Sequence, residues 1–464
     1  MPYSSDSSPT STNRRVWQLA WPSILSNLLF TTVGFLHIKI VADLGTSAVA
    51  AVTTGHRVFF LVQAILMGVS VAATALIARH WGAGQVARAE LVTWTTLLLS
   101  IALAAVLSIP VLLVPEGIAA LFGLDPVTTA SAAGFIFWLG VFNIFSAINM
   151  MLGTALRAIG DVITPLLYLF FSSVLNILFA YSMAFGTGPL PALGVAGVAL
   201  GGSFGALLVT AVFLAQWWRG KYGLKALKKR AIDWTTARQL VSIGAPAVLE
   251  QGVVQLAFLV FFAIVARYGT NAYAAYGIGI SLVSFSIVVG FGFGIAAATL
   301  VGQQLGAGKP ELARKAGWRS LWMAVIAMAI FSLLLVAFAE ELARFMIDDP
   351  EVIHLTVVFI YFIALVQPIM AGEFTLAGSL RGAGDTRFPL LATLCGIILG
   401  RLVPAWIAAG LGLSVYWIFA VMILDYCIKA ALLIRRFRSS HWQDIRLDTP
   451  DQSNTTVDSD KNNT

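Results

Sequence analysis

A few ionisable side chains lie inside long apolar stretches of this sequence, where a charge is costly and usually has a function. His37 can gain and lose a proton near neutral pH, so it is a candidate for a group that couples proton movement to other work. Glu250 and Glu373 are carboxyl groups in similar surroundings and are further candidates for ion coupling. The chemistry that these residues predict is the exchange of protons or cations.

Each of these candidates also has a structural interpretation. His37 could be a neutral ring that is hydrogen-bonded within a helix bundle, and each glutamate could pair with a basic neighbour. Lys39 lies near the end of its apolar stretch, so we expect it to reach toward water and to pair with Asp43 four residues later. Arg401 and Asp425 fall in the middle of two neighbouring apolar stretches. We expect them to form a buried ion pair that fixes geometry more than it stabilises the fold.

Amide and thioether side chains inside the apolar stretches are candidates for contacts with a substrate. Methionine suits an adaptable apolar pocket, and amides can orient a bound molecule. For any single amide, a hydrogen bond that holds two helices together is the commoner role. The candidates for a substrate site are Asn27, Asn149, Gln251, Gln255 and Met370.

The composition indicates that membrane-spanning helices position these residues. Apolar residues make up 59% of the chain and charged residues only 11%, whereas about a quarter of a soluble chain is charged. Lipid admits only helices or closed barrels, and the apolar runs do not alternate with polar residues as barrel strands would. We therefore expect an all-α membrane protein with twelve transmembrane helices. Cys395 and Cys427 both lie in apolar runs, so no disulfide framework is predicted.

The sequence of the first half recurs in the second half at an offset of 224 positions, as from Pro22 to Pro246. One register without gaps relates the two copies, which indicates a structural repeat. Six spans in each half make the repeat parallel, and such repeats enclose a central cleft in transporters that work by alternating access. We expect two six-helix lobes around a central cleft. The further matched pairs are Gly45 and Gly269, Gly84 and Gly308, Asp125 and Asp349, and Gly160 and Gly384.

The predicted division has five parts: an N-terminal tail (1–16), an N-lobe (17–218), a basic linker (219–240), a C-lobe (241–437) and a disordered tail (438–464). The net charge of +7 comes from basic residues in short loops, so it does not indicate a nucleic-acid partner. These loops lie on one side of the predicted spans, which places both termini in the cytoplasm. The polar start lacks the apolar core of a cleavable signal, so the first stretch is expected to stay as a membrane anchor.

Several motifs resemble those of the multidrug and toxic compound extrusion (MATE) family, most closely its DinF-type branch. The resemblance covers about residues 14–437 and implies two six-helix lobes around a cleft. It also implies export of amphipathic, often cationic compounds against an inward flow of protons or sodium. The residues that carry it are Ala20 and Pro22, Leu44-Gly45-Thr46, Gly82-Ala83-Gly84, Leu156-Arg157 with Gly160-Asp161, and Leu380-Arg381 with Gly384-Asp385.

The chain departs from the family pattern where ion coupling is expected. The first helix of the family usually carries an aspartate fifteen residues after the proline, and this chain has His37 there. The fifth helix usually carries an asparagine followed four residues later by an aspartate, and this chain has Asn176 and Ala180. By this resemblance Asn176 is a further coupling candidate. The loss of both aspartates favours a proton over sodium as the driving ion.

We therefore expect a secondary active multidrug exporter that exchanges xenobiotic amphipathic compounds for protons in the plasma (inner) membrane. It is expected to work as a monomer, without a cofactor or metal. The alternative is a lipid-linked oligosaccharide flippase of the same superfamily. An intramembrane enzyme is less favoured. The stretch from Gly382 to Asp385 resembles the active-site string of membrane aspartyl proteases, but no second aspartate motif completes a catalytic dyad.

Overall fold

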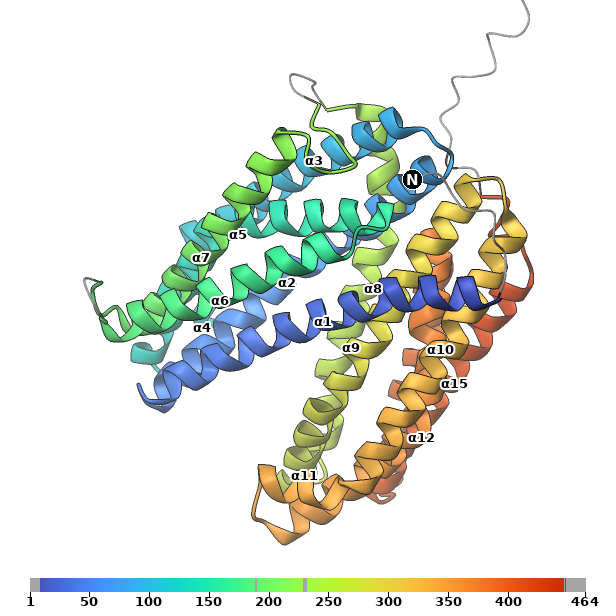
Figure 1. Cartoon of the computed structure of the whole chain (residues 1–464). Helices are drawn as coiled ribbons and strands as arrows, with labels where there is room; N and C mark the ends of the chain where they lie inside the picture. Colours follow the sequence, from blue (N-terminus) through green and yellow to red (C-terminus); the bar gives the residue numbers. More distant parts are fainter. Residues whose placement is uncertain (1–8, 188–189, 228–231, 446, 448–464) are drawn as a thin grey trace, which may run out of the picture.

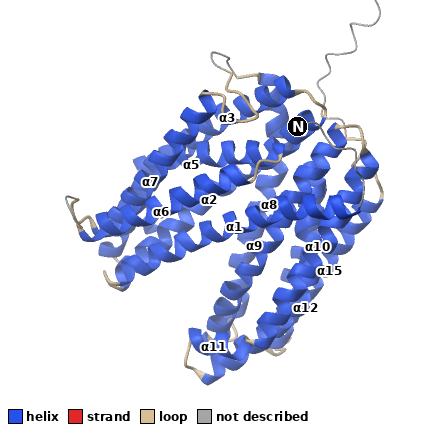
Figure 2. Cartoon of the chain, viewed as in Figure 1, coloured by secondary structure: helices blue, strands red, loops and turns tan. Residues whose placement is uncertain are grey.

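The protein is described here by a computed structural model that covers residues 9–187, 190–227, 232–445 and 447. The described residues form helices and loops without strands (Figure 2). Twelve of the helical segments in this part of the chain are long and apolar enough to cross a membrane. The predicted all-α membrane fold with twelve spans is thereby confirmed.

The first half of the chain contributes six spans and one short helix. The short helix is α4 (Pro115–Ala120), between the third and fourth spans. The spans are α1 (Pro9–Ala42), α2 (Thr46–Gly82), α3 (Val86–Leu113), α5 (Pro126–Ile159), α6 (Ile163–Phe185) and α7 (Gly194–Trp218).

The second half has the same order, with the short helix α11 (Ala339–Met346) in the place of α4. The eleventh span of the chain, which is the fifth of this half, is one continuous helix whose winding changes. It runs from α13 (Arg387–Cys395) through the π-helix η1 (Gly396–Leu402) to α14 (Val403–Gly410). The other spans are α8 (Trp234–Ala266), α9 (Thr270–Gly306), α10 (Pro310–Ala337), α12 (Pro350–Gly382) and α15 (Val415–Arg438).

Matched glycines end or begin matched helices with nearly the same backbone conformation. Gly45 before α2 has φ 102° and Gly269 before α9 has φ 96°. Gly160 after α5 has φ 98°, and Gly384 after α12 has φ 91°. L-residues with side chains rarely adopt such positive φ values, so glycine is needed at each of these turns. The sequence repeat is therefore also a repeat of backbone structure.

The fourth span of each half begins with the same cap. The side chain of Asp125 accepts hydrogen bonds from two backbone N–H groups in the first turn of α5, and Asp349 does the same for α12. A proline follows each aspartate at the first helical position, where its missing N–H costs nothing. These caps fix where the two equivalent helices start.

The two halves meet through contacts that are images of each other under the repeat. A Cβ atom added at Gly82 of α2 would overlap the carbonyl of Gln303 on α9, and one added at Gly306 would overlap the carbonyl of Arg79 on α2. Residues 79 and 303, like 82 and 306, are 224 positions apart. The α2–α9 contact therefore lies on a pseudo-two-fold axis that relates the N-lobe to the C-lobe, as expected for a parallel repeat.

The first helix of each lobe also contacts the other lobe. Gly68 of α2 leaves room for Val248 of α8, and the equivalent Gly292 of α9 leaves room for Ile24 of α1. Gln303 extends this interface by donating from Nε2 to the carbonyl of Ala158 at 2.8 Å. In Figure 1, the lobes join at the end where the N-terminus lies and diverge toward α4 and α11.

Several helices extend beyond the predicted spans. The first helix begins at Pro9, inside the predicted tail 1–16, and α8 begins at Trp234, inside the predicted linker 219–240. After α15 the chain also stays packed: Trp442 is fully buried, and its ring stacks on Phe437 at 4.6 Å. The predicted start of the disordered tail at residue 438 is therefore too early, because Trp442 packs into an apolar site of the folded protein. Residues 448–464 lie outside the described part of the chain.

Candidate functional site

The N-lobe brings together two of the predicted coupling residues from different helices. His37 of α1 is 4% exposed, and its Nε2 lies 2.6 Å from Oδ1 of Asn176 on α6. The Nδ2 group of Asn176 donates to the carbonyl of Gly202 on α7 at 3.0 Å. Because that carbonyl can only accept, the amide oxygen must face His37, and His37 must donate from Nε2. This network assigns the tautomer of a neutral His37 ring, with its free lone pair on Nδ1.

Glycines of α7 hold Asn176 in this position. A Cβ atom at Gly202 would lie 2.9 Å from Nδ2 of Asn176, and one at Gly205 would lie 2.6 Å from the backbone nitrogen of the same residue. Helices α6 and α7 can therefore approach each other closely, as small residues allow between helices in membranes. Close packing of α6 on α7 thus positions the amide that His37 contacts.

A second histidine, which the sequence analysis did not single out, lies beside His37. The ring of His56 on α2 stacks on the ring of His37 with a centroid distance of 5.5 Å, and it contacts Phe135 edge-on. Nδ1 of His37 and Nε2 of His56 are buried nitrogens without a hydrogen-bond partner in the described part of the chain. The signal that could have found His56 is its position as a polar residue in the apolar second span.

Among the described residues, the histidine pair has no charged partner. Asn176 and His56 are the polar contacts of His37, and within the described residues no ion pair involves either ring. Lys39 is exposed on the same helix, and the expected ion pair with Asp43 does not form between these described residues. A proton added to His37 would therefore bring an uncompensated charge into an apolar lobe.

The C-lobe carboxyl groups, in contrast, are paired with basic groups. Glu250 of α8 is buried and accepts from Nη2 of Arg381 at 2.6 Å and from Oγ1 of Thr393 at 2.9 Å. These two bonds tie α8 to α12 and α13. The basic neighbour that was the structural alternative for Glu250 is therefore present.

A second and larger group of charges surrounds Lys429 of α15, which the sequence analysis did not mention. Its Nζ lies 3.3 Å from Oε1 of Glu373 on α12 and 3.3 Å from Oδ1 of Asp425 on α15. Arg401 of η1 forms an ion pair with the other oxygen of Asp425. Glu373 and the predicted pair of Arg401 and Asp425 thus belong to one network in which two acidic and two basic side chains balance.

The π-helix η1 places this network against α15. A Cβ atom at Gly396 would lie 2.5 Å from Cγ of Lys429 and 2.6 Å from Oδ1 of Asp425, and one at Gly400 would lie 2.6 Å from Cα of Asp425. A π-helix winds more residues into each turn than an α-helix, which changes which side chains face the neighbouring helix, and such segments are frequent at functional sites. Here the change turns two glycines and Arg401 toward the charges of α15.

Aromatic rings surround the two cations. The guanidinium of Arg401 lies over the rings of Phe261 and Tyr426, at 5.8 and 5.4 Å from the centroids. Nζ of Lys429 lies 5.0 Å from the centroid of Tyr426. Ring faces attract cations, and the attraction is stronger where water is excluded. The rings therefore help to hold both cations inside the lobe.

The predicted substrate residues do not form one cluster. Nδ2 of Asn149 lies 3.4 Å from Oγ1 of Thr210, which joins α5 to α7. Met370 is fully buried in the apolar core of the C-lobe. The other three residues are half-buried and lie on the first helix of each lobe. They are Asn27 on α1, and Gln251 and Gln255 on α8.

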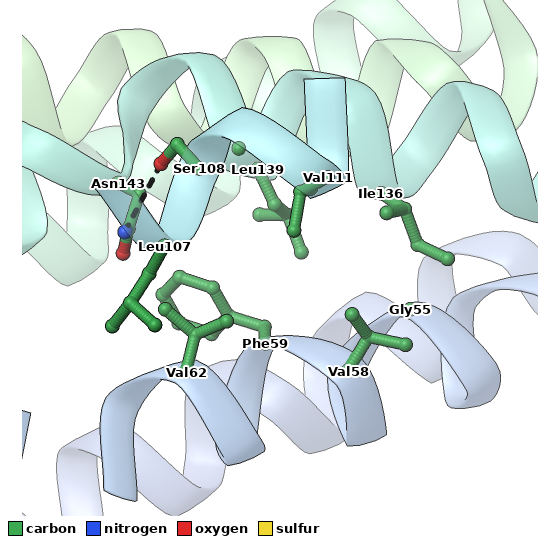
Figure 3. A pocket seen from close by; sticks show the side chains of 11 residues that line it. Gly55, Val58, Phe59, Val62, Leu107, Ser108, Val111, Ile136, Leu139 and Asn143 are labelled. Carbon is green, nitrogen blue, oxygen red and sulfur yellow. Dashed lines mark hydrogen bonds between the residues drawn. The ribbon is translucent and has the colours of Figure 1, made fainter. Parts of the chain in front are cut away.

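Two of the cavities among the described residues have no predicted substrate residue in their lining. The first, between α2, α3 and α5 in the N-lobe, has about 10 Å³ of space, enough for about one water molecule (Figure 3). At its end Asn143 donates to Ser108 at 3.2 Å. The second is an open groove of about 370 Å³ between α8 and α14, lined by apolar residues and Arg267. Of these two, the groove has the size of a small-molecule site.

Comparison with known families decides the class of protein. The family model MatE matches residues 22–182 and again residues 246–407. These stretches make up most of the chain, and they begin at Pro22 and Pro246, the prolines that open the two copies of the repeat. The chain belongs to the MATE family. This finding confirms the resemblance seen in the motifs, whereas the DinF-type branch stays a prediction.

Similar proteins are named as multidrug resistance proteins or as transporters. A probable multidrug resistance protein NorM from Thermotoga maritima is 28% identical over 439 residues, which cover 92% of each chain. A probable NorM from Bradyrhizobium diazoefficiens is 30% identical over 458 residues, covering 91% of this chain and 92% of the relative. An FAD transporter from Shewanella oneidensis is 24% identical over 83% of this chain and 86% of its own.

Solved structures show the same fold. A MOP superfamily transporter from Pyrococcus furiosus has a TM-score of 0.86 and covers 92% of this MATE chain and 95% of its own. The Vibrio cholerae MATE transporter VcmN in its bent form also has a TM-score of 0.86, over 94% and 99% of the two chains. Both are 18% identical to this chain. The family match, the named relatives and the twelve apolar helices together make the protein a multi-pass membrane transporter of the multidrug efflux family MATE rather than an enzyme.

Proposed function

We propose that this MATE protein is a secondary active exporter that exchanges amphipathic, often cationic compounds for protons, with His37 as the proton-binding group. The observation that carries the proposal is the position of His37. Its ring is buried, hydrogen-bonded to Asn176 and stacked on His56, and it has no charged partner among the described residues. Imidazole is the side chain whose charge changes near physiological pH.

Protonation would change the N-lobe locally. The neutral ring already uses Nε2 toward Asn176, so an added proton goes to Nδ1, which has no partner among the described residues. A buried positive charge without a counter-charge is unfavourable. The protonated ring therefore favours an arrangement of α1 in which this charge is better solvated. A proton can shift the balance between two arrangements only by such a difference in affinity.

The first helix also supplies a route from His37 to the interface between the lobes. Helix α1 carries His37 in one half and Ile24 in the other, and Ile24 fills the space left by Gly292 on α9 of the C-lobe. A bend or rotation of α1 on protonation would change this contact. Pro22, inside α1, gives the helix a point at which bending is least costly.

The cellular setting is part of the proposal. The basic loops lie on the side where α2 meets α9, so we place this side and both termini in the cytoplasm and the protein in the plasma membrane as a monomer. The lobes are assigned to residues 17–218 and 241–437, and the protein to the DinF-type branch. The half-buried amides of α1 and α8, such as Asn27 and Gln255, are proposed to face the transported compound.

Transport by purified protein in lipid vesicles tests the proposal. A fluorescent cationic dye is loaded, and a pH gradient or a sodium gradient is imposed separately. Transport is expected to follow the pH gradient and to ignore the sodium gradient. His37→Phe is expected to abolish the response, whereas Lys39→Met, an exposed residue on the same helix, is expected to leave it intact. Dye movement that follows sodium alone would refute proton coupling.

A further inference from the structure

Lys429 occupies a position between two carboxylates where a free cation could bind. Its Nζ is 3.3 Å from Oε1 of Glu373 and 3.3 Å from Oδ1 of Asp425, and the residue is 4% exposed. Oε2 of Glu373 is a buried oxygen without a hydrogen-bond partner in the described part of the chain. The oxygens that surround the ammonium group are of the kind that bind sodium and other hard cations.

The fold around Lys429 is built to admit its side chain. The hydrocarbon part of Lys429 lies where any side chain at Gly396 would be, because a Cβ atom there would come within 2.5 Å of Cγ. The π-helix η1 brings this glycine to α15, and the ring of Tyr426 lies 5.0 Å from the ammonium. Three elements, α12, η1 and α15, thus form a compartment that one tethered cation fills.

The charges of the compartment balance only while the lysine is present. Arg401 pairs with one oxygen of Asp425, so Lys429 is, among the described residues, the remaining cation for the other oxygen and for Glu373. A buried carboxylate that loses its partner carries a large desolvation cost. Loss of the ammonium group would therefore create a demand for another cation at the same place.

We propose that Lys429 is a tethered cation that determines ion specificity, because its ammonium group fills the Glu373–Asp425 position and denies it to sodium. The inference rests on the proposed function, since it concerns the ion that drives transport. It implies that the C-lobe keeps its charge throughout the transport cycle. It also implies that one substitution opens a sodium site in this lobe.

The test compares the full-length protein with Lys429→Met, which keeps the volume of the side chain and removes its charge. The melting temperature of each purified protein is measured while sodium chloride replaces choline chloride up to about 100 mM, at constant ionic strength and pH. The wild type is expected to melt at the same temperature in both salts. The methionine variant is expected to gain a saturable rise of a few degrees that is specific to sodium.

Two control variants separate the charge from other effects of the substitution. Lys429→Arg retains a cation, so its melting temperature is expected to show no response to sodium. Lys429→Met combined with Glu373→Gln removes one of the two carboxylates, so the sodium response gained by the single variant is expected to disappear.

A folded Lys429→Met protein that melts equally in sodium and choline would overturn the proposal. A second result would also overturn it: sodium raises the melting temperature of the wild type, and Glu373→Gln removes this rise. That result does not require Lys429→Met to fold. Failure here is distinct from failure of the proposed function. These are equilibrium measurements without a pH gradient, whereas proton coupling is rejected only by transport that ignores such a gradient.

Discussion

The two lobes share a backbone plan but treat buried polar groups in opposite ways. In the N-lobe, His37 and His56 stack on each other, His37 has the amide of Asn176 as its polar partner, and no charged group in the described part of the chain pairs with either ring. In the C-lobe, Glu373, Lys429 and Asp425 belong to a network in which acidic and basic side chains balance. An uncompensated titratable group responds to protonation, whereas a balanced network resists a change of charge. Under the proposed function, we therefore expect the N-lobe to switch on protonation and the C-lobe to keep a fixed geometry.

Equivalent positions of the two halves show where the lobes agree and where their buried side chains differ. The glycine turns and aspartate caps are kept in both halves. The position that corresponds to His37 in the C-lobe is Phe261, whose ring lies beside Arg401. Glu373 corresponds to Asn149 in the N-lobe. The two lobes thus agree in backbone geometry at these positions and differ in their buried side chains.

The largest effect is expected from breaking the C-lobe network. Arg401→Met leaves Asp425 with one cation in place of two, and removing one partner of a buried pair costs about 3–5 kcal/mol. We expect a large fall in the melting temperature. Arg344→Met is the matched control, because its pair with Glu340 is exposed on both sides and contributes about 1 kcal/mol or less. Equal melting temperatures for the two variants would show that the C-lobe network does not hold the fold.

The next effect is expected on transport, from the N-lobe. His37→Phe copies the residue found at the equivalent C-lobe position and removes the titratable ring. We expect transport driven by a pH gradient to fall at least about tenfold, while the melting temperature stays near that of the wild type, because phenylalanine suits a buried apolar site. Initial rates of dye transport in vesicles measure this. Rates equal to those of the wild type would move the coupling group away from the N-lobe.

A smaller effect is expected from the amide that orients His37. Asn176→Ala removes the acceptor of the His37 hydrogen bond, which contributes about 0.5–1.5 kcal/mol and corresponds to a rate change of up to about tenfold. We expect slower transport that still follows the pH gradient. The dependence of the rate on external pH distinguishes this variant from His37→Phe. Complete loss of the pH response would make Asn176 indispensable rather than orienting.

The smallest effect tests what the lobes have in common. Asp125→Ala and Asp349→Ala each remove the cap of an equivalent helix, and both caps accept from the same two backbone positions. We expect small falls in melting temperature that are similar for the two variants. A loss confined to one variant would show that the lobes differ in their contribution to stability even where their backbones agree.

The sequence was sufficient for the features that depend on length, composition and repetition. Apolar runs long enough to cross a bilayer predicted the twelve spans, and the offset between matched residues such as Gly45 and Gly269 predicted the repeat, which the backbone conformation shows at these two glycines. Motifs such as Leu156-Arg157 predicted the family. These signals lie along the chain, so no knowledge of packing was needed.

The partners of the buried groups could not be predicted in the same way. His56 and Lys429 each meet residues of other helices, and which face of a span points inward is not visible in a run that is apolar all round. The π-helix η1 departs from α-helical periodicity, so the direction in which Arg401 points could not be predicted from α-helical spacing. The apolar site that buries Trp442 is formed by segments that are distant in the sequence. The local sequence does not show this site, so it predicted a disordered tail there.

The central claim is that the N-lobe exchanges the proton while the C-lobe keeps its charge. Proton release on substrate binding tests it directly: a cationic dye is added to weakly buffered protein in detergent, and the change in pH is recorded. The wild type and Glu373→Gln are expected to release protons when the dye binds, and His37→Phe is expected to bind the dye without release. Release that persists in His37→Phe, or that disappears in Glu373→Gln, would contradict the account.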